Sequence, residues 1–250
     1  MQTADSIGSG VPLYVPCRKL SFSAPLRWLR KGWQDFRRAP WHSLTYGAIF
    51  VLIGWLFLYF AWDKGSDTLV FSLLLGFLIM GPVLAFGLYD ISHQLELNHK
   101  PSFRHERQKA LHEMGHELMF AMMLGMMFVI LVIVLSMVIG AEPTPGRVTA
   151  TFAVSPLLVT VIFAGVVFCA SAFALPMILH RDADATTAIM TSINAVMRNK
   201  RVLALWALMI FVLTAVGFAT ALIGLAFIVP VLGYATWHAY RETIISNGAA

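Results

Sequence analysis

The chain has 250 residues, of which 58% are hydrophobic and 12% are charged, and its formal net charge at pH 7 is +5. A chain of this length with a mean hydropathy of +0.74 is too apolar for a water-soluble domain, so we expect a polytopic membrane protein. Basic residues that flank apolar segments are signals of membrane orientation, and we therefore expect no nucleic-acid partner.

Five long stretches of the chain contain no formally charged residue. A helix needs about 20 apolar residues to cross roughly 30 Å of hydrocarbon, so each of the first four stretches predicts one transmembrane helix. The fifth, at 202–240, is nearly twice as long and predicts two helices that turn near Gly217–Gly224. The predicted fold is all-α, with one transmembrane domain at 21–244 between a tail at 1–20 and a tail at 245–250. Its six predicted spans are at about 43–62, 68–89, 118–140, 153–179, 202–218 and 221–238.

The Lys and Arg residues are distributed unevenly between the connectors. Sixteen of the eighteen lie in 1–42, 90–117, 181–201 and the C-terminal end, and only Lys64 and Arg147 lie elsewhere. By the positive-inside rule, this predicts a multi-pass protein of the bacterial inner membrane with both termini in the cytoplasm. None of the predicted spans contains Asp, Glu, Lys or Arg, which argues against an ion-coupled transporter.

The ends of the even-numbered spans resemble one another. The segment 82–89 matches 230–237 as proline, two aliphatic residues, a small residue, an aromatic, a small residue, any residue and an aromatic, and a looser copy begins at Pro176. Pro82, Pro176 and Pro230 are each expected to kink a helix near its exit. Three related helical hairpins are therefore predicted. The alternative is a hairpin membrane protein without repeats, because amphipathic segments before the spans also occur in such proteins.

A short amphipathic segment precedes each odd-numbered span, at 26–38, at 104–117 and at 187–199. In the first of these, the apolar residues of one helical face are Leu26, Leu29, Trp33 and Phe36, and basic or polar residues occupy the opposite face. Each segment predicts a cytoplasmic interfacial helix that lies against anionic headgroups of the lipid bilayer. The tryptophans near the predicted span ends are expected to form interfacial belts, and they include Trp28, Trp33, Trp41, Trp62, Trp206 and Trp237.

Several short motifs together resemble a family of prokaryotic six-helix integral membrane proteins of unknown function. The motifs are Trp28, Gly32-Trp33, Asp35, Pro40, Ser43-Leu44, Tyr46-Gly47, Tyr89-Asp90-Ile91-Ser92, Glu96, Pro101-Ser102, Leu205-Trp206-Ala207 and, as the most specific, the run from Pro230 to Arg241. The resemblance covers roughly 19–244. It implies an inner-membrane location, and some members carry the label of a cytochrome c oxidase subunit. It implies no catalytic residue.

One segment carries the H-E-x-x-H pattern, at His112, Glu113 and His116. In zinc proteases the two histidines of this pattern bind the metal and the glutamate activates its water. The pattern therefore suggests a membrane zinc metallopeptidase with Glu113 as the catalytic residue. No recognisable motif for a third ligand follows, because the chain enters a predicted span at Leu118, and that ligand would have to come from elsewhere in the chain. Ordinary polar residues before a span are therefore the preferred interpretation.

The same segment suggests a second metal hypothesis. His105, His112, His116, Met119, Met123, Met126 and Met127 fall on one helical face, within an arc of roughly 100°. Imidazoles at the membrane edge followed by thioethers inside it could handle Cu(I), because soft thioether sulfur suits that ion. Methionine is also an adaptable packing residue, and packing is the preferred interpretation.

His238 is the single histidine of most interest, because it lies next to Trp237 in the most specific motif. In the alignment of the predicted repeat it stands opposite Asp90. A pair between His238 and Asp90 across the helix bundle is therefore a hypothesis.

Together these patterns predict a non-catalytic protein that serves as an accessory or scaffolding subunit of a membrane complex, such as a respiratory oxidase. Its partners would be the bilayer and other membrane subunits, and no cofactor is expected. The alternatives are copper handling by the His and Met face and zinc hydrolysis by the H-E-x-x-H motif.

Overall fold

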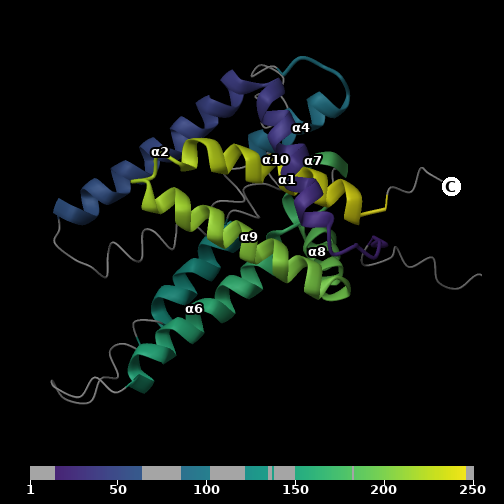
Figure 1. The fold of residues 1–250 in the computed structure, drawn as a ribbon. Coiled ribbons are helices and arrows are strands. Elements are labelled where there is room, and N and C mark those ends of the chain that lie inside the picture. Colours follow the sequence, from purple (N-terminus) through teal and green to yellow (C-terminus); the bar gives the residue numbers. More distant parts are fainter. Residues whose placement is uncertain are drawn as a thin grey trace, which may run out of the picture.

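The computed structural model of the chain describes residues 15–63, 86–101, 122–134, 137, 150–181 and 183–245, with the backbone alone at 60–63 and 150–157. Within these ranges the secondary structure is helical, apart from one isolated β-bridge. The helices, arranged as in Figure 1, are α1 (Ala24–Arg38), α2 (Pro40–Asp63), α4 (Phe86–Glu96), α6 (Ala150–Ser171), α7 (Ala174–Arg181), α8 (Ala185–Arg198), α9 (Lys200–Ala219) and α10 (Leu225–Thr243), together with a shorter apolar helix, Met122–Val134. The predicted all-α class is confirmed.

Three helical segments in the described ranges are long and apolar enough to cross a membrane: Pro40–Tyr59, Leu158–Arg181 and Lys200–Ala219. They coincide with the first, fourth and fifth predicted spans. Met122–Val134 lies within the third predicted span, and α10 covers most of the sixth. The second predicted span lies mostly outside the described residues, so six crossings remain a prediction.

The fourth predicted span is interrupted near its end. α6 stops at Ser171 and α7 starts at Ala174, two residues before Pro176. Proline has no backbone N–H to continue the ladder of hydrogen bonds, which accounts for a break at this position. Pro230, by contrast, lies buried inside a continuous α10. Pro82 lies outside the described residues.

α1 packs against α10 more extensively than any other described pair of helices does. A Cβ added at Gly32 would lie 2.5 Å from the carbonyl oxygen of Val231, so only glycine permits this approach of the two backbones. The contact turns Trp28, Gly32, Asp35 and Phe36 inward. Of the apolar face predicted to lie at the membrane interface, Phe36 is instead buried against the protein, whereas Leu26 and Trp33 are exposed.

α2 packs along the first half of α10 through small residues. A Cβ at Gly47 would overlap the backbone of Ala226, and a Cβ at Gly54 would press on the side chain of Leu222. Nearer the start of α2, at the same interface, the hydroxyls of Ser43 and Tyr234 share a buried hydrogen bond of 2.8 Å. These contacts allow a span to lie close against α10.

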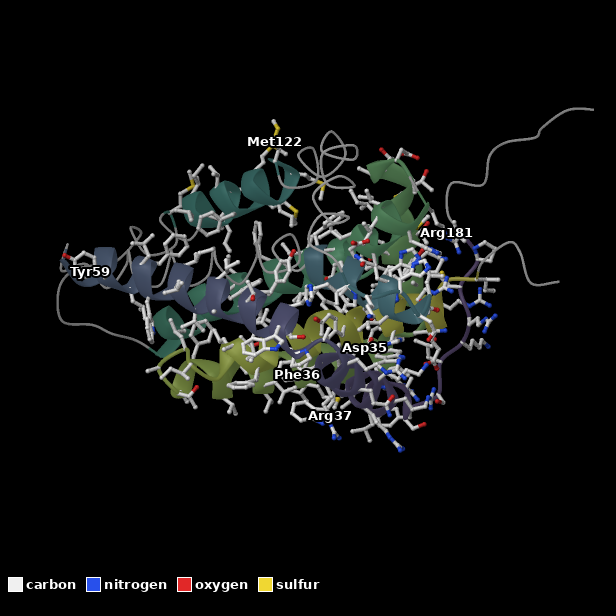
Figure 2. All side chains as sticks on the ribbon, turned by 90° about the horizontal axis from the view of Figure 1, so that it is seen from above. Asp35, Phe36, Arg37, Tyr59, Met122 and Arg181 are labelled. Carbon is white, nitrogen blue, oxygen red and sulfur yellow. The ribbon has the colours of Figure 1, made fainter. Side chains whose placement is uncertain are left out.

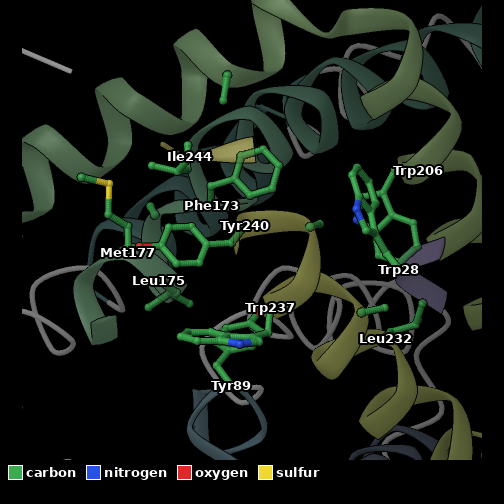
Figure 3. Close-up of a cluster of buried hydrophobic side chains, with 14 of the residues drawn as sticks. Trp28, Tyr89, Phe173, Leu175, Met177, Trp206, Leu232, Trp237, Tyr240 and Ile244 are labelled. Atoms are coloured by element: carbon green, nitrogen blue, oxygen red, sulfur yellow. The ribbon is translucent and has the colours of Figure 1, made fainter. Parts of the chain in front are cut away.

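Large aromatic side chains fill the core beneath α1 and α10 (Figure 3). Trp28 and Trp206 meet edge to face, with ring centroids 5.6 Å apart, and Trp237 packs near Tyr240. All four side chains are at most 1% exposed. The belt interpretation of the tryptophans is therefore wrong for these three, because their rings supply core volume, whereas Trp33 and Trp41 are exposed.

The two ends of the described chain lie side by side (Figure 1). Cys17 and Ile244 form an antiparallel bridge, and the N–H of Arg18 donates to the carbonyl oxygen of Thr243 at 2.8 Å. On the other side of the N-terminal segment, the N–H of Leu20 donates to Oδ1 of Asn199 at 2.9 Å. The residues before α1 are thus held between the end of α10 and the junction of α8 and α9.

Nitrogen and oxygen atoms gather at one end of the molecule, around Asp35 and Arg181, while the end at Tyr59 is mostly carbon (Figure 2). This division fits a protein with one polar end outside the hydrocarbon and helical shafts within it.

α1 and α2 share their register with α8 and α9 at a constant spacing of 160 residues. The first helix of each pair ends at an arginine, Arg38 or Arg198, and the next begins two residues later. Five of the six buried positions in each of α1 and α8 also match, as the pairs Pro25 and Ala185, Trp28 and Ala188, Gly32 and Ser192, Asp35 and Ala195, and Phe36 and Val196. In addition, α1 packs on α10 and α8 packs on α7, so both lead-in helices lie against an exit helix.

Candidate functional site

Polar side chains from several helices gather around the C-terminal half of α10. The residues of α10 that precede Pro230 are apolar, and from Tyr234 onward polar side chains occur on every face of the helix. α1, α4 and α7 pack around this half of α10 and supply its partners. We call the polar side chains gathered here the polar cluster, and they are Asp35, Asp90, Ser92, His93, Gln94, Glu96, His180, Trp237, His238, Tyr240, Arg241 and Glu242.

A carboxylate on α1 connects three helices at the centre of the polar cluster. Nε2 of His238 lies 2.7 Å from Oδ2 of Asp35, and the hydroxyl of Ser92 donates to the same oxygen at 2.7 Å. The side chains of Asp35 and His238 are 6% and 15% exposed, so both lie largely out of water. A charged or strongly polar pair in this position ties α1, α4 and α10 together.

The carboxylate that we expected beside His238 has a different partner. Nε2 of Gln94 donates to Oδ2 of Asp90 at 2.7 Å, one turn further along α4. Asp90 is 1% exposed, and its Oδ1 has no hydrogen-bond partner among the described residues. Leaving one oxygen of a buried carboxylate unpaired costs free energy, which marks Asp90 as the least satisfied member of the polar cluster.

Glu96, at the end of α4, binds two residues of α10. Nε of Arg241 donates to both carboxylate oxygens at 3.1 Å, and Nε1 of Trp237 donates to Oε2 at 3.1 Å. Partial burial acts to raise the pKa of Glu96, but the hydrogen bond and charge of Arg241, with the Trp237 bond, outweigh it and lower the pKa below the ordinary 4.5. Glu96 is therefore held as a carboxylate.

Two histidines complete the side of the polar cluster that faces α7. The rings of His93 and His180 stand edge to face at 5.3 Å, and both contact Trp237. Nδ1 of His180 lies 3.0 Å from the hydroxyl of Tyr240, and its Nε2 lies 3.4 Å from Arg241. Both ring nitrogens of His180 thus face protein groups, and one of these groups is the cation Arg241. His180 is therefore poorly placed to bind a metal ion. No set of three or more metal-ligating side chains occurs in the part of the chain that the structure describes.

At the outer edge, Glu242 joins α10 to the start of α1. Nη2 of Arg27 forms an ion pair with Oε1 of Glu242, and Nε1 of Trp28 donates to Oε2 at 2.9 Å. The acidic groups of the polar cluster other than Asp90 are therefore bonded from helix to helix. Chemically, this arrangement locks four helices at one end of the bundle and leaves few groups free to act on a substrate.

Sequence reasoning identified His238, Trp237 and Asp90 but missed the partner Asp35. A signal was available, since Asp35 is the only acidic residue in α1 and follows Trp28 and Gly32 by seven and three residues, on one helical face. A lone acid on the inward face of a basic helix indicates a buried partner.

Most of the predicted metal-binding residues lie outside the described residues: His105, His112, Glu113, His116 and Met119. Of the remaining members of that face, Met123 and Met127 pack against the core, and Met126 is 60% exposed. The copper and zinc hypotheses therefore remain untested predictions.

The comparison with known proteins found one family. Residues 69–180 match the model of a family described as "Predicted integral membrane protein (DUF2189)", which is a little under half of the chain. This match confirms the resemblance to a membrane-protein family of unknown function, and the chain is an integral membrane protein. No curated protein and no solved structure matches the chain.

Proposed function

We propose, from this family match and from the packing of the spans, that the protein is a non-catalytic accessory or scaffolding subunit of a complex in the bacterial inner membrane. The observation that carries the proposal is the exposure of the spans. Only 22% of the most apolar stretch of Lys200–Ala219 is buried inside the protein. The outward side chains of α9 that are half exposed or more are Leu208, Phe211, Val212 and Val216. Such a face packs on lipid or on the helices of a partner.

A glycine on the outward face of α6 favours partner helices over lipid alone. No described atom lies within 4 Å of a Cβ built at Gly165, and its neighbours Val161, Ile162 and Val166 are exposed. Glycine weakens a helix unless another backbone approaches closely, as α10 does at both Gly32 and Gly47. We therefore assign the face of α6 around Gly165 to a partner helix.

The polar cluster supports a structural role at the opposite end. Its hydrogen bonds and ion pairs run from one helix to another, as in the bonds of Asp35, Glu96 and Glu242. Groups that are bonded to one another are poorly placed to donate or accept protons from a substrate. The polar cluster would hold the helices in a fixed arrangement that a partner can recognise.

The pairing of the chain ends supports the proposed orientation. Cys17 and Ile244 can form a bridge only if both lie on one side of the membrane, which supports an even number of crossings. The exposed basic residues of α1 lie at this end, which supports its placement in the cytoplasm. The 160-residue register of α1–α2 with α8–α9 supports the three-hairpin repeat and, with it, six crossings.

The test is purification of the tagged chain from its native membrane in mild detergent, followed by native mass spectrometry. We expect a discrete complex with another membrane protein. Gly165→Leu should release the partner while leaving the thermal unfolding of the chain unchanged, because no described atom occupies that space. Gly125→Leu is a parallel variant on another helix whose Cβ position is also open, and it tests whether the effect is specific to the face of α6.

Two results would contradict the proposal. One is a chain that purifies alone and monodisperse in every mild detergent. The other is stoichiometric copper or zinc in the purified protein, measured by elemental analysis, which would support a metal-dependent function instead.

A further inference from the structure

α1 has two exposed faces in addition to the one that packs on α10. Phe22 lies in the turn just before α1, and within the helix, where successive residues are turned by about 100°, Trp33 and Leu26 follow one another beside the buried face. They are 66%, 49% and 64% exposed, respectively. Arg37 and Arg30 come next in the same direction and border this apolar stripe. The exposed surface thus changes from apolar to basic within a narrow arc.

The arginines on this border have no internal counter-charge. Arg27, further round the helix, is neutralised by Glu242. Arg30 and Arg37 form no ion pair with any carboxylate in the described part of the chain, where Asp35 faces His238 and Glu96 faces Arg241. The positive charge of the border is therefore available to an anion from outside the protein.

The border also lies at the depth where the chain enters the membrane. α2, the first described span, begins at Pro40, and the ring of Trp41 is 81% exposed beside it. Figure 2 places Phe36 and Arg37 between the polar end at Arg181 and the apolar end at Tyr59. Exposed tryptophan at the end of a span is typical of the boundary between hydrocarbon and headgroups.

We propose that the exposed face of α1 is a binding site for anionic phospholipid. Phe22, Leu26 and Trp33 contact the acyl chains, and the guanidinium groups of Arg30 and Arg37 bind the headgroup phosphate. Arginine suits this role because its planar fork donates two parallel hydrogen bonds to phosphate. The inference rests on the orientation in the proposed function, with α1 at the cytoplasmic leaflet.

The surface favours lipid over the other anions that a basic helix can bind. Nucleic acid and free phosphate need positive charge but gain nothing from an adjacent apolar stripe. A phospholipid uses both, because its phosphate and its acyl chains lie next to each other. The juxtaposition of Trp33 with Arg30 and Arg37 is therefore the feature that selects the ligand.

The experiment uses the full chain in nonionic detergent, titrated with phosphatidylglycerol or with phosphatidylcholine of the same acyl chains, with bound lipid counted by native mass spectrometry. The wild-type chain should bind phosphatidylglycerol in preference to phosphatidylcholine. In Arg30→Gln/Arg37→Gln we expect phosphatidylglycerol binding to weaken by about fivefold for each arginine removed, which corresponds to about 1 kcal/mol per basic residue near an anionic surface. The matched control is Arg18→Gln/Lys19→Gln, which removes the same charge from an exposed segment without an apolar stripe.

The outcomes separate the sources of the effect. Equal losses in the two double variants would overturn the proposal, because binding would then follow net charge alone. It would also be overturned by wild-type binding without headgroup preference, by displacement of the lipid by millimolar inorganic phosphate, or by undiminished binding in Trp33→Ala. Partner complexes are scored on the same wild-type preparations. If the wild-type chain retains its partner but binds no phosphatidylglycerol, only this site is refuted; if it binds phosphatidylglycerol but has no partner, only the proposed function is refuted. Unchanged helical circular dichroism verifies that the variants are folded.

Discussion

The pair of His238 with Asp35 offers a quantitative test of the polar cluster. His238→Leu would leave Asp35 buried, with the hydroxyl of Ser92 as its remaining partner at 2.7 Å. Removing one member of a buried pair costs about 3–5 kcal/mol, because the remaining group loses its partner without regaining water. Since the two side chains retain 6% and 15% exposure, we expect the lower part of that range, about 3 kcal/mol.

A double-mutant cycle separates the pair from general packing effects. If the pair acts as a unit, Asp35→Leu/His238→Leu should lose less stability than the sum of the two single variants, with a coupling of at least about 1.5 kcal/mol. The assay is unfolding in mixed detergent micelles followed by circular dichroism. Arg38→Leu, an exposed change on the same helix, is the control and should have little effect. Additive single effects would refute the assignment of this pair as the tie between α1 and α10.

The remaining predictions concern packing, acidity and thiol reactivity. Gly47→Ala should lower the free energy of unfolding by about 1–3 kcal/mol, because its Cβ would overlap the backbone of α10. Gly165→Ala should be neutral or stabilising in the isolated chain, because its Cβ position is open and alanine favours a helix. Thermal unfolding of the two variants measures the difference. Because the pKa of Glu96 is lowered in the folded protein, its contribution to stability is complete above pH 4.5 and is lost as the pH falls through the folded pKa. The melting temperature of Glu96→Gln should therefore drop less between pH 6 and pH 3 than that of wild type. If the melting temperature of Glu96→Gln falls as much as that of wild type, the pairing of Glu96 with Arg241 is not the source of the acid sensitivity. Cys17 is 2% exposed and burial raises the pKa of its thiol, so it should react with iodoacetamide at pH 7.5 only after unfolding, as measured by mass spectrometry; rapid labelling of the native chain would contradict the paired ends.

The sequence carried enough information to predict the helical class and the main spans. Charge-free runs of the required length coincide with α2, α6–α7 and α9, because the bilayer demands a length that few other structures need. The ends of these runs were less well predicted. Whether a helix stops near a proline depends on its neighbours, as the different surroundings of Pro176 and Pro230 illustrate.

Side-chain partners were predicted poorly, because they depend on how distant helices meet. The amphipathic pattern of α1 was read as one apolar face, but the approach of α10 at Gly32 selected the face with Trp28 and Asp35. His238 was expected beside a carboxylate on α4, and the nearest one belongs to α1 instead. Periodicity identifies a face that can be buried, and the tertiary structure decides which face is buried.

The proposed orientation has the polar end, with both ends of the described chain, facing the cytoplasm while the opposite end faces outward. Single cysteines introduced in a Cys17→Ser/Cys169→Ser background test it directly, at the exposed Ser23 before α1 and at Ile223, which is 55% exposed in the turn between α9 and α10. In intact spheroplasts, a membrane-impermeant maleimide should label Ile223→Cys, and it should label Ser23→Cys only after lysis. Labelling of Ser23→Cys in intact spheroplasts, or protection of Ile223→Cys until lysis, would contradict the account.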